Sequence, residues 1–489
     1  MKSIKTIKHY TIQALAILPI SAVLLTACHK DILEAVPVTS ISNESAYSTP
    51  AKILAQVNGI YSQFSTASFY GGRFQVFNEQ RGDEFSQNDG NNSTGANVWN
   101  QSISASGDFV NAVWSAGYTT INSSNLLIDN LAASTVIPDS VRKGYIAEAK
   151  FLRAFSYLSL VQTYAKPYAQ SSTSPALPLR LKAETSSSNN DLAFSSVADV
   201  YTQIIKDLNE AETDLPVSYS SALLNASRAH KASAIALKTR VYLSKGDYAS
   251  VVTEAAKLVS AAAPFQYVSG NLTHKLEANV ATVFAGSYVG NEAVFTIPFI
   301  NPAEAPALQS ALAANYLTPV VYLNSAGIAA DPVFASATSV DARKGLISTN
   351  ATGQKLVKKF PKNSAPYTDY IPVIRYAEVL LNYAEATAQT GDLTKATALL
   401  KAVRNRSDAT YTFTSGIDTK ENLVNTILNE RRIELLGEGF RTPDLLRRVQ
   451  ALPAKTGTAG TAPEVLPTAS NYVWAIPSNE LAYNGLSPK

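Results

Sequence analysis

Apolar residues recur with a helical period along most of the chain. In residues 140–166, apolar side chains form two stripes at spacings of three and four, one of which runs through Phe151 and Phe155. Two apolar faces predict a helix that packs on both sides. Similar patterns predict a helix over 197–215 and another over 420–436. The pattern as a whole therefore predicts a mainly α fold.

Two further segments are expected to form pairs of helices, each turning at a Gly-Asp dipeptide. Glycine can end the first helix in the left-handed conformation, and aspartate can cap the second. Each pair resembles the tetratricopeptide repeat, a helix–turn–helix unit that stacks on its neighbours, although two unrelated helical hairpins would give the same pattern. The pairs comprise residues 228–243 with 248–258, and residues 374–389 with 394–406.

Strand-like and loop-like segments fill the rest of the pattern. Residues 292–299 form the clearest candidate strand, and Asp418 with Glu421 indicates a capping box before the helix at 420–436. Long stretches rich in Ser, Asn, Gly or Pro predict loops, and a helical scaffold that carries such loops places a variable binding surface on a rigid base. These loops cover residues 86–96, 171–190, part of 301–341, and 453–470.

The first 28 residues have the pattern of a bacterial lipoprotein signal. Three lysines precede a mostly apolar run over residues 12–27, and the sequence LTAC ends at Cys28, the only cysteine of the chain. The run is too short and too interrupted by polar residues and proline to span a bilayer. We therefore expect residues 1–27 to be a signal peptide that is removed. Cys28 is expected to carry a lipid anchor rather than to be a buried thiol.

Charge and composition limit the kinds of molecule that the protein is expected to bind. Removal of residues 1–27 takes away three of the 41 Lys and Arg and none of the 38 Asp and Glu, so the mature chain is formally neutral. No basic field remains to hold nucleic acid. Charged residues make up only 16% of the chain and tyrosine is abundant, with 24 residues. Such a composition favours neutral hydrogen-bonding and stacking contacts, as sugar or peptide binders make.

The sequence shows few features of an enzyme. The histidines beyond the leader, His29, His230 and His274, lack metal-ligand spacing. No nucleophile elbow, phosphate loop or dinucleotide fingerprint is present, so no metal and no cofactor is expected. A carboxylate pair for glycoside hydrolysis is defined by geometry and not by spacing. A surface-anchored glycoside hydrolase therefore stays open as an alternative.

Six segments carry a resemblance to known proteins, and together they cover most of the mature chain. They include the lipidated start with the first helix, the motif WSAGYTTINSSNLLIDNL, the motif YIPVIRYAEVLLNYAEA and the charged motif ERRIELLGEGFRTPDLLRR. In order, they are residues 28–64, 114–131 with 147–165, 176–181 with 197–216, 370–386, 430–448 and 472–481. In this order the segments resemble the SusD/RagB family of nutrient-binding outer-membrane lipoproteins.

The resemblance implies a SusD-like fold with the tetratricopeptide-like pairs as scaffold. An N-terminal region over 28–220 and a C-terminal region over 221–489 would form one globular unit. The protein would be a non-catalytic lipoprotein of the outer membrane that faces the cell exterior. It would capture an oligosaccharide or a peptide and deliver it to a partner, a SusC-type TonB-dependent transporter. A structural subunit of the transporter that binds no cargo is a further alternative.

The resemblance also directs the choice of ligand-binding candidates. Binding proteins of this family hold ligands by aromatic stacking, so aromatics in polar loops are the candidates. Trp99 fits best because it follows the polar stretch GNNSTGANV, although its ring could instead fold back onto the scaffold. Asp83 matches an acidic residue of relatives and could hydrogen-bond near the ligand. The remaining candidates are Phe69 and Tyr70, and Tyr316 and Tyr322 after the predicted strand.

Alternating charges in residues 430–448 surround the predicted end of a helix. Arginine can satisfy carboxylates and helix carbonyls with two parallel hydrogen bonds. We expect these charges to support the scaffold rather than to form an acid/base site. Arg375, Glu378 and Glu385 share a helix face at spacings of three and seven, and we expect them to pair locally.

Overall fold

The computed structural model describes residues 43–186, 188 and 190–488. Cys28 and the predicted signal peptide lie outside the described residues. Ala55–Lys489 forms one compact unit. In the described part of the chain, no helix combines the length and the apolar character needed to cross a membrane.

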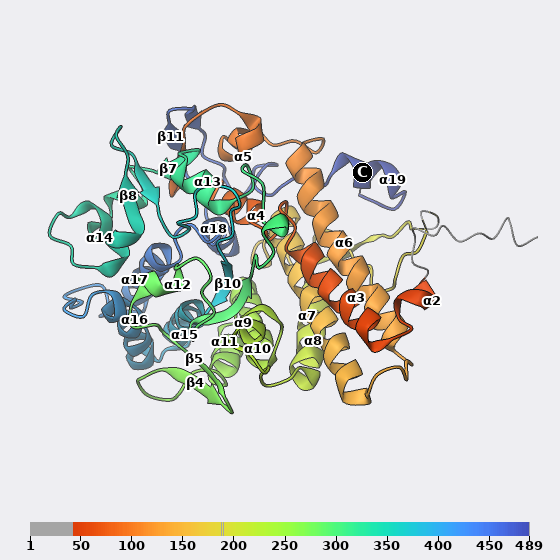
Figure 1. Cartoon of the computed structure of the whole chain (residues 1–489). Coiled ribbons are helices and arrows are strands. Elements are labelled where there is room, and N and C mark those ends of the chain that lie inside the picture. Colours follow the sequence, from red (N-terminus) through yellow and green to blue (C-terminus); the bar gives the residue numbers. More distant parts are fainter. Residues whose placement is uncertain (1–42, 187, 189, 489) are drawn as a thin grey trace, which may run out of the picture. The chain divides into compact units, whose positions relative to one another are not determined.

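Helices make up 48% of the described chain, and the strands, at 10%, are short (Figure 1). The helices are α2 (Asn43–Ala46), α3 (Pro50–Phe64), α4 (Arg73–Gln80), α5 (Ala96–Trp99), α6 (Asp108–Leu131), α7 (Asp139–Tyr164), α8 (Val197–Asp214), α9 (Ala222–Ser227), α10 (Lys231–Lys245), α11 (Tyr248–Ala255), α12 (Val280–Val283), α13 (Leu312–Leu317), α14 (Pro332–Ala335), α15 (Tyr376–Thr390), α16 (Leu393–Ser407), α17 (Lys420–Glu434), α18 (Arg441–Arg447) and α19 (Ser478–Tyr483). The strands are β1 (Phe85–Gln87), β2 (Pro175–Pro178), β3 (Phe194–Ser196), β4 (Gln266–Ser269), β5 (Leu272–Lys275), β6 (Ala293–Ile297), β7 (Val321–Leu323), β8 (Ile347–Thr349), β9 (Lys355–Val357), β10 (Ile371–Arg375), β11 (Lys455–Gly457) and β12 (Gly460–Ala462).

The long helices pack against one another in succession. Helix α6 packs on α7, α7 on α8 and α8 on α10, and helices α10 and α11 then pack on α15, which contacts α16 and α17 (Figure 1). Both predicted apolar faces of α7 are buried, since Phe151, Leu152 and Phe155 are inaccessible to solvent. The helices expected over 140–166, 197–215 and 420–436 are therefore confirmed as α7, α8 and α17.

The two predicted helix pairs are confirmed together with their turns. Helix α10 ends at Gly246 with φ 74°, and α15 ends at Gly391 with φ 102°, so both glycines adopt the left-handed conformation. The carboxylate of Asp247 accepts a hydrogen bond from the backbone N–H of Ser250, and that of Asp392 accepts one from Lys395. The Gly-Asp dipeptides thus end one helix and begin the next.

The capping box expected at Asp418 is wrong by one residue. Helix α17 is capped by Thr419, whose hydroxyl accepts a hydrogen bond from the backbone N–H of Asn422 at 3.2 Å. The carboxylate of Asp418 instead accepts a hydrogen bond from the side-chain amide of Asn422 at 3.0 Å. Threonine fills the cap position because its hydroxyl reaches the same free backbone donors.

The described strands form two-stranded antiparallel pairs, and three of these pairs lie next to one another. The strand expected over 292–299 is confirmed as β6, which pairs with β10. Strand β1 pairs with β7, and these two strands also contact β11 and β9 respectively. Through these contacts, segments far apart in the sequence share one surface.

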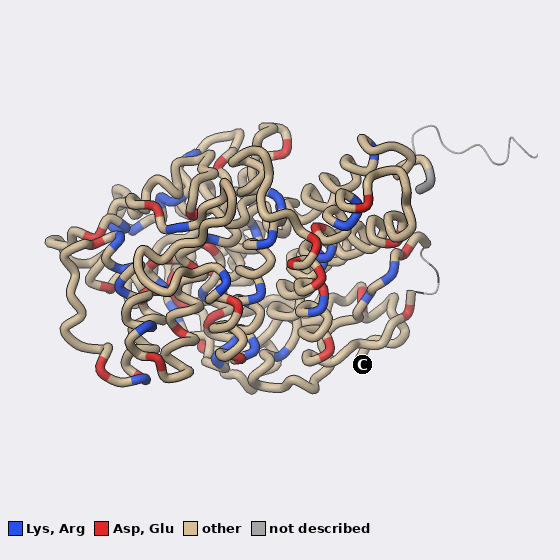
Figure 2. The backbone as a smooth tube through the Cα atoms, turned by 90° about the horizontal axis from the view of Figure 1, so that it is seen from below, with Lys and Arg blue, Asp and Glu red and all other residues tan. Residues whose placement is uncertain are grey.

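Lys and Arg residues are interspersed with Asp and Glu residues along the backbone of the described chain (Figure 2). Many of these charges form ion pairs, and the pairs with the least exposed partners join Arg343 and Arg375 to carboxylates of α17 and the turn after it. Buried charges are tolerated only when they are paired and hydrogen-bonded. The paired charges therefore support the scaffold.

Candidate functional site

Four polar segments meet where β1, β7, β9 and β11 lie together. We name this surface the Tyr322 platform and define it as Asn88–Thr94, Tyr322, Gln354 and Thr458. Strand β1 places Ser86 opposite Tyr322, and the backbone N–H of Asn88 donates to Val320 at 2.9 Å. The side-chain amide of Gln354 donates to that of Asn88 at 3.4 Å, and the N–H of Ala459 donates to Gln87 at 3.0 Å.

Tyr322 is the half-buried aromatic of this platform. Its hydroxyl oxygen accepts a hydrogen bond from the backbone N–H of Thr458 at 3.0 Å and lies 3.2 Å from the Thr458 hydroxyl. The contact fixes the ring through its polar end. A ring fixed in this way can stack on a ligand with little loss of side-chain freedom.

Side chains of α4 hold the loop Asn88–Thr94 in place by hydrogen bonds. The guanidinium group of Arg73 donates to the carbonyl of Ser93 at 2.8 and 2.9 Å, and the side-chain amide of Gln80 donates to the carbonyl of Thr94 at 2.8 Å. Gly95 follows with φ 86°, and a Cβ atom at this position would lie 2.3 Å from Oε1 of Gln80. The loop is therefore ordered before any ligand binds.

The platform presents neutral hydrogen-bonding groups to solvent. Its half-buried side chains are amides, a hydroxyl and the Tyr322 ring, and its exposed side chains add further amides, hydroxyls and one carboxylate, that of Asp89. Such groups can bind the hydroxyls of a sugar while an aromatic ring covers an apolar C–H face. The exposed residues are Asp89, Gly90, Asn91, Asn92, Ser93 and Thr458, and the half-buried ones are Asn88, Thr94, Tyr322 and Gln354.

Trp99 does not line this platform, and the expectation that its ring is exposed is wrong. The side chain is only 1% exposed, because the short helix α5 turns it beneath β1. Its indole N–H donates to the carbonyl of Phe85 at 2.9 Å, and the ammonium group of Lys455 lies 5.6 Å from the ring centroid. The alternative that the ring folds back onto the scaffold is the one observed, so Trp99 supports the platform from inside.

Phe69 and Tyr70 also belong to the core rather than to a ligand surface. Phe69 is inaccessible and Tyr70 is 8% exposed, and both rings pack against Phe64. The Tyr70 hydroxyl lies 2.9 Å from the hydroxyl of Ser159, and burial raises the pKa of Tyr70 to about 12. The neighbouring Gly71 made the segment look like a loop, but it marks a close backbone approach to Ser65.

Tyr316 is the fourth candidate that the structure places in the interior. Its side chain is inaccessible to solvent, and its hydroxyl donates to the carbonyl of Gly437 at 3.0 Å. Burial raises the pKa of Tyr316 well above its usual value, and the nearby Glu79 and Glu438 add to this shift. Tyr316 is therefore not available to a ligand at the surface.

Asp83 is half-buried but its carboxylate is already paired. The Arg441 guanidinium donates to Asp83 at 3.0 Å, and Arg432 approaches it at 3.8 Å. Burial alone would raise the pKa of Asp83, but the hydrogen bond and charge of Arg441 outweigh it and lower the pKa. Asp83 therefore holds the scaffold next to β1 rather than a ligand.

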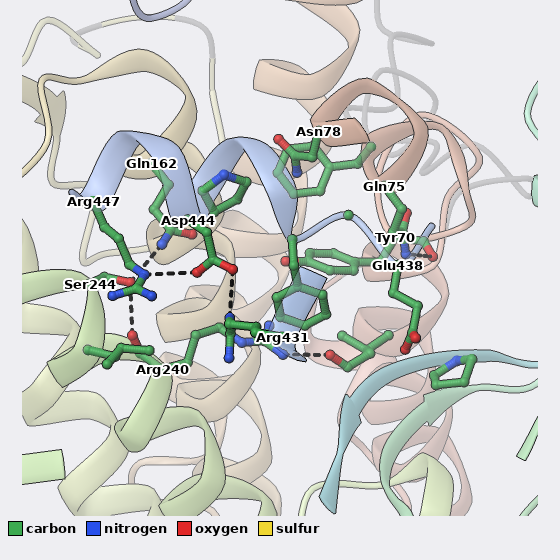
Figure 3. A pocket seen from close by; sticks show the side chains of 17 residues that line it. Tyr70, Gln75, Asn78, Gln162, Arg240, Ser244, Arg431, Glu438, Asp444 and Arg447 are labelled. Atoms are coloured by element: carbon green, nitrogen blue, oxygen red, sulfur yellow. Dashed lines mark hydrogen bonds and ion pairs between the residues drawn. The ribbon is translucent and has the colours of Figure 1, made fainter. Parts of the chain in front are cut away.

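The charges of the motif at 430–448 pair within the scaffold, as expected. The local pairing expected for Arg375, Glu378 and Glu385 is wrong, because they pair instead with Glu438, Arg240 and Arg447 from other segments. Figure 3 shows Asp444 between Arg431 and Arg447, with Nε of Arg447 donating at 2.8 Å and Nε of Arg431 at 2.6 Å. Arg240 lines the same pocket, and it forms two hydrogen bonds with Glu378, at 2.7 and 2.6 Å. The cavity that this network encloses is about 40 Å³, enough for a few water molecules but not for a sugar.

Sequence reasoning therefore identified part of the platform. It selected Tyr322 and the polar stretch that contains Asn88–Thr94. It did not select Gln354 or Thr458, because these residues come from separate hairpins and only the strand contacts bring them to the platform. The predicted loop 453–470 contains Thr458 without singling it out, and no local pattern in the sequence marks Gln354.

The paired helices, short strands and surface loops define a mainly helical binding protein with a SusD-like fold. The structure resembles a SusD superfamily protein from Bacteroides fragilis with a TM-score of 0.81 and 28% identity, covering 91% of this chain and 100% of that one. It also resembles a laminarin-binding SusD-like protein with a TM-score of 0.69 and 22% identity, covering 90% of this chain and 99% of that one.

Sequence comparisons agree with the fold. Residues 276–486 match the SusD family, and residues 33–243 match a family described as starch-binding and associating with the outer membrane. The chain is 26% identical to SusD-like protein P2 of Formosa agariphila over 514 residues, which covers 94% of this chain and 96% of that protein. The chain belongs to the SusD/RagB family.

Proposed function

We propose that the protein is a cell-surface lipoprotein that captures a neutral oligosaccharide at the Tyr322 platform. The observation that carries this proposal is the chemistry of the platform, where a fixed aromatic ring lies among amide and hydroxyl groups. A polysaccharide fragment offers both C–H faces for stacking and hydroxyls for hydrogen bonds. The likeness to a laminarin-binding protein supports a glycan rather than a peptide as cargo.

Capture would serve transport across the outer membrane. The cargo would pass to a SusC-type TonB-dependent transporter, with which the protein would form a complex. The lipid on Cys28 would act as a tether on the outer surface, which raises the local concentration of bound cargo at the transporter. The description of the family as associating with the outer membrane supports this arrangement.

The tether can be tested separately from binding. Cys28→Ala should release the chain from the membrane fraction, because no other residue would carry the acyl chains. Exposure at the cell surface is read by protease accessibility in intact cells. Retention of the Cys28→Ala chain in membranes would contradict the proposed anchor.

Binding is tested by titration calorimetry of the full chain with maltoheptaose and laminarihexaose. Tyr322→Ala should weaken binding about tenfold, because it removes the stacking ring. Tyr322→Phe is the matched control, since it keeps the ring and removes only the hydroxyl. Equal affinities of Tyr322→Ala and the unchanged chain would exclude the platform, and a chain that binds neither glycan would favour a structural subunit without cargo.

A further inference from the structure

A second concave surface shares no residue with the Tyr322 platform. A cavity of about 600 Å³ opens between α6, the loop through Arg180 and Glu184, and α19. This volume lies within the range of small-molecule binding sites, roughly 300–1,000 Å³. It is also far larger than the cavity of about 40 Å³ inside the charged network.

One face of α6 supplies hydroxyl groups to this cavity. Ser115, Thr119 and Ser123 line it at a spacing of four residues, which places them one above the other on the helix. Among the described residues, none of these three hydroxyls has a hydrogen-bonding partner. Ser115 and Thr119 are exposed, so both are free to bind a ligand.

Aromatic side chains line the same cavity. Trp114 is 6% exposed and is held in place by the rings of Tyr118 and Tyr164, whose centroids lie 4.8 and 5.0 Å from its own. Tyr483, on α19, is 85% exposed. In the described chain, the next most exposed large hydrophobic side chain is that of Val340, at 69%. A ring left in solvent beside an aromatic wall is placed to close over a ligand.

The walls of the cavity are fixed by paired backbone contacts. The side-chain amide of Asn122 donates to the carbonyl of Glu184 at 3.0 Å and accepts from its N–H at 2.8 Å. Asn484 makes the same two contacts with Leu192, at 2.8 and 3.0 Å. Both the loop and the C-terminal segment are therefore held in position without a ligand.

The charges of the cavity do not favour an anion. Arg180 forms an ion pair with Glu184 and lies 3.8 Å from a carboxylate oxygen of Glu480. The lining thus holds one cation and two carboxylates, and the cation is already paired. A phosphate or carboxylate ligand would meet net negative charge. The free hydroxyls and the aromatic rings suit a neutral polyhydroxylated ligand.

We propose that this cavity is a second glycan-binding site, which takes a short neutral oligosaccharide between α6 and α19. Tyr483 stacks on the sugar, and the α6 hydroxyls bind its hydroxyl groups. The site shares no residue with the platform, so glycan binding in this cavity can be tested separately from the function proposed above. Two sites on one chain would hold a long polysaccharide at two points and raise its overall affinity.

The test uses the full chain carrying Tyr322→Ala, which weakens binding at the platform, with maltoheptaose and laminarihexaose as probes. Binding is followed by tryptophan fluorescence, because Trp114 lines the cavity whereas Trp99 and Trp474 are buried elsewhere. At least one probe should give a saturable change that Trp114→Phe abolishes. Tyr483→Ala should weaken this binding about tenfold, and Thr119→Arg, at an exposed position, should abolish it by filling the cavity.

Three results would overturn the proposal. The first is the absence of a saturable response to either probe in the Tyr322→Ala chain. The second is a response that Thr119→Arg leaves unchanged, since the glycan would then bind elsewhere. The third is a Thr119→Arg chain that loses a co-purifying polypeptide while no glycan binds, which would make the cavity a protein-docking surface. Circular dichroism of Tyr483→Ala and Thr119→Arg verifies that both variants fold.

Discussion

Two buried histidines should make the stability of this protein fall as the solution becomes acidic. His230 at the start of α10 and His274 on β5 are 0% and 2% exposed, and their Nε2 atoms lie 3.0 Å apart. Each Nδ1 faces a backbone carbonyl, that of Arg228 at 3.3 Å and that of Asn291 at 3.2 Å. The ring of Tyr267 stacks on His274. Among the described residues, neither imidazole forms an ion pair, so nothing compensates a positive charge there.

The size of this loss of stability follows from the difference between the histidine pKa values in the folded and in the unfolded chain. Burial lowers the pKa of His230 to about 3, helped by the charge of His274, and burial lowers the pKa of His274 to about 4. The unfolded chain has histidine pKa values of about 6.5. Between these values the unfolded state binds protons that the folded state does not, so stability is full above pH 6.5 and falls below it. At pH 5 the loss is about 2 kcal/mol for each histidine.

The assay is urea denaturation at pH 7 and pH 5, with the variant His230→Gln/His274→Gln as control. Other groups titrate in both chains, so the difference between the two pH dependences isolates the histidines. We expect the unchanged chain to lose about 4 kcal/mol more than the variant over this range. If the folded pair holds a third proton throughout this range, which would satisfy all three contacts, the difference should be about 1 kcal/mol instead. Equal pH dependences would refute the reasoning, because they would mean that neither histidine is buried uncharged.

Three substitutions test the architecture around the platform and the core. Gly95→Ala should cost about 1–2 kcal/mol and weaken glycan binding, because φ is positive and the new Cβ would clash with Gln80; thermal unfolding and calorimetry measure the two effects. Trp99→Ala should cost about 3–5 kcal/mol in denaturant unfolding, since it empties a core position; a selective loss of binding without this cost would restore Trp99 as a ligand contact. Arg375→Met should cost about 3–5 kcal/mol because it leaves the buried carboxylates of Glu434 and Glu438 with one cation fewer; added salt should recover little of the lost stability in the same unfolding assay.

The helical scaffold could be predicted from the sequence because its signals are local. The two apolar stripes of α7 reflect its burial on both faces. The Gly-Asp dipeptides predict the turns of both helix pairs, because the glycine can adopt the left-handed conformation and the aspartate can cap the next helix. The exact cap of α17 was missed, since Asp418 and Thr419 can both supply a capping oxygen. Local chemistry therefore predicts that a helix forms, but it places the first residue of the helix only to within one position.

The ligand surface could not be predicted in the same way. Polar neighbours made Trp99 look exposed, but the four-residue helix α5 turns its ring inward, and no periodicity is visible over so short an element. Gln354 and Thr458 reach the platform only because β7 contacts β9 and β1 contacts β11. Tyr322 lies half-buried on β7 and stays a predicted ligand contact, whereas Tyr316, from the same predicted loop region, is buried on α13.

The segments that carry the family resemblance are also those whose residues contact one another. Arg375, in the segment 370–386, pairs with Glu434 and Glu438 in the segment 430–448. The backbone N–H of Trp474, in the last segment, donates to the carbonyl of Thr163 at 2.9 Å. Changing one member of such a pair removes a partner from a buried group. The platform and the α6 face differ, because they present polar groups to solvent, where a ligand can reach them. The resemblance therefore identifies the fold, and the cargo must be read from the surface residues.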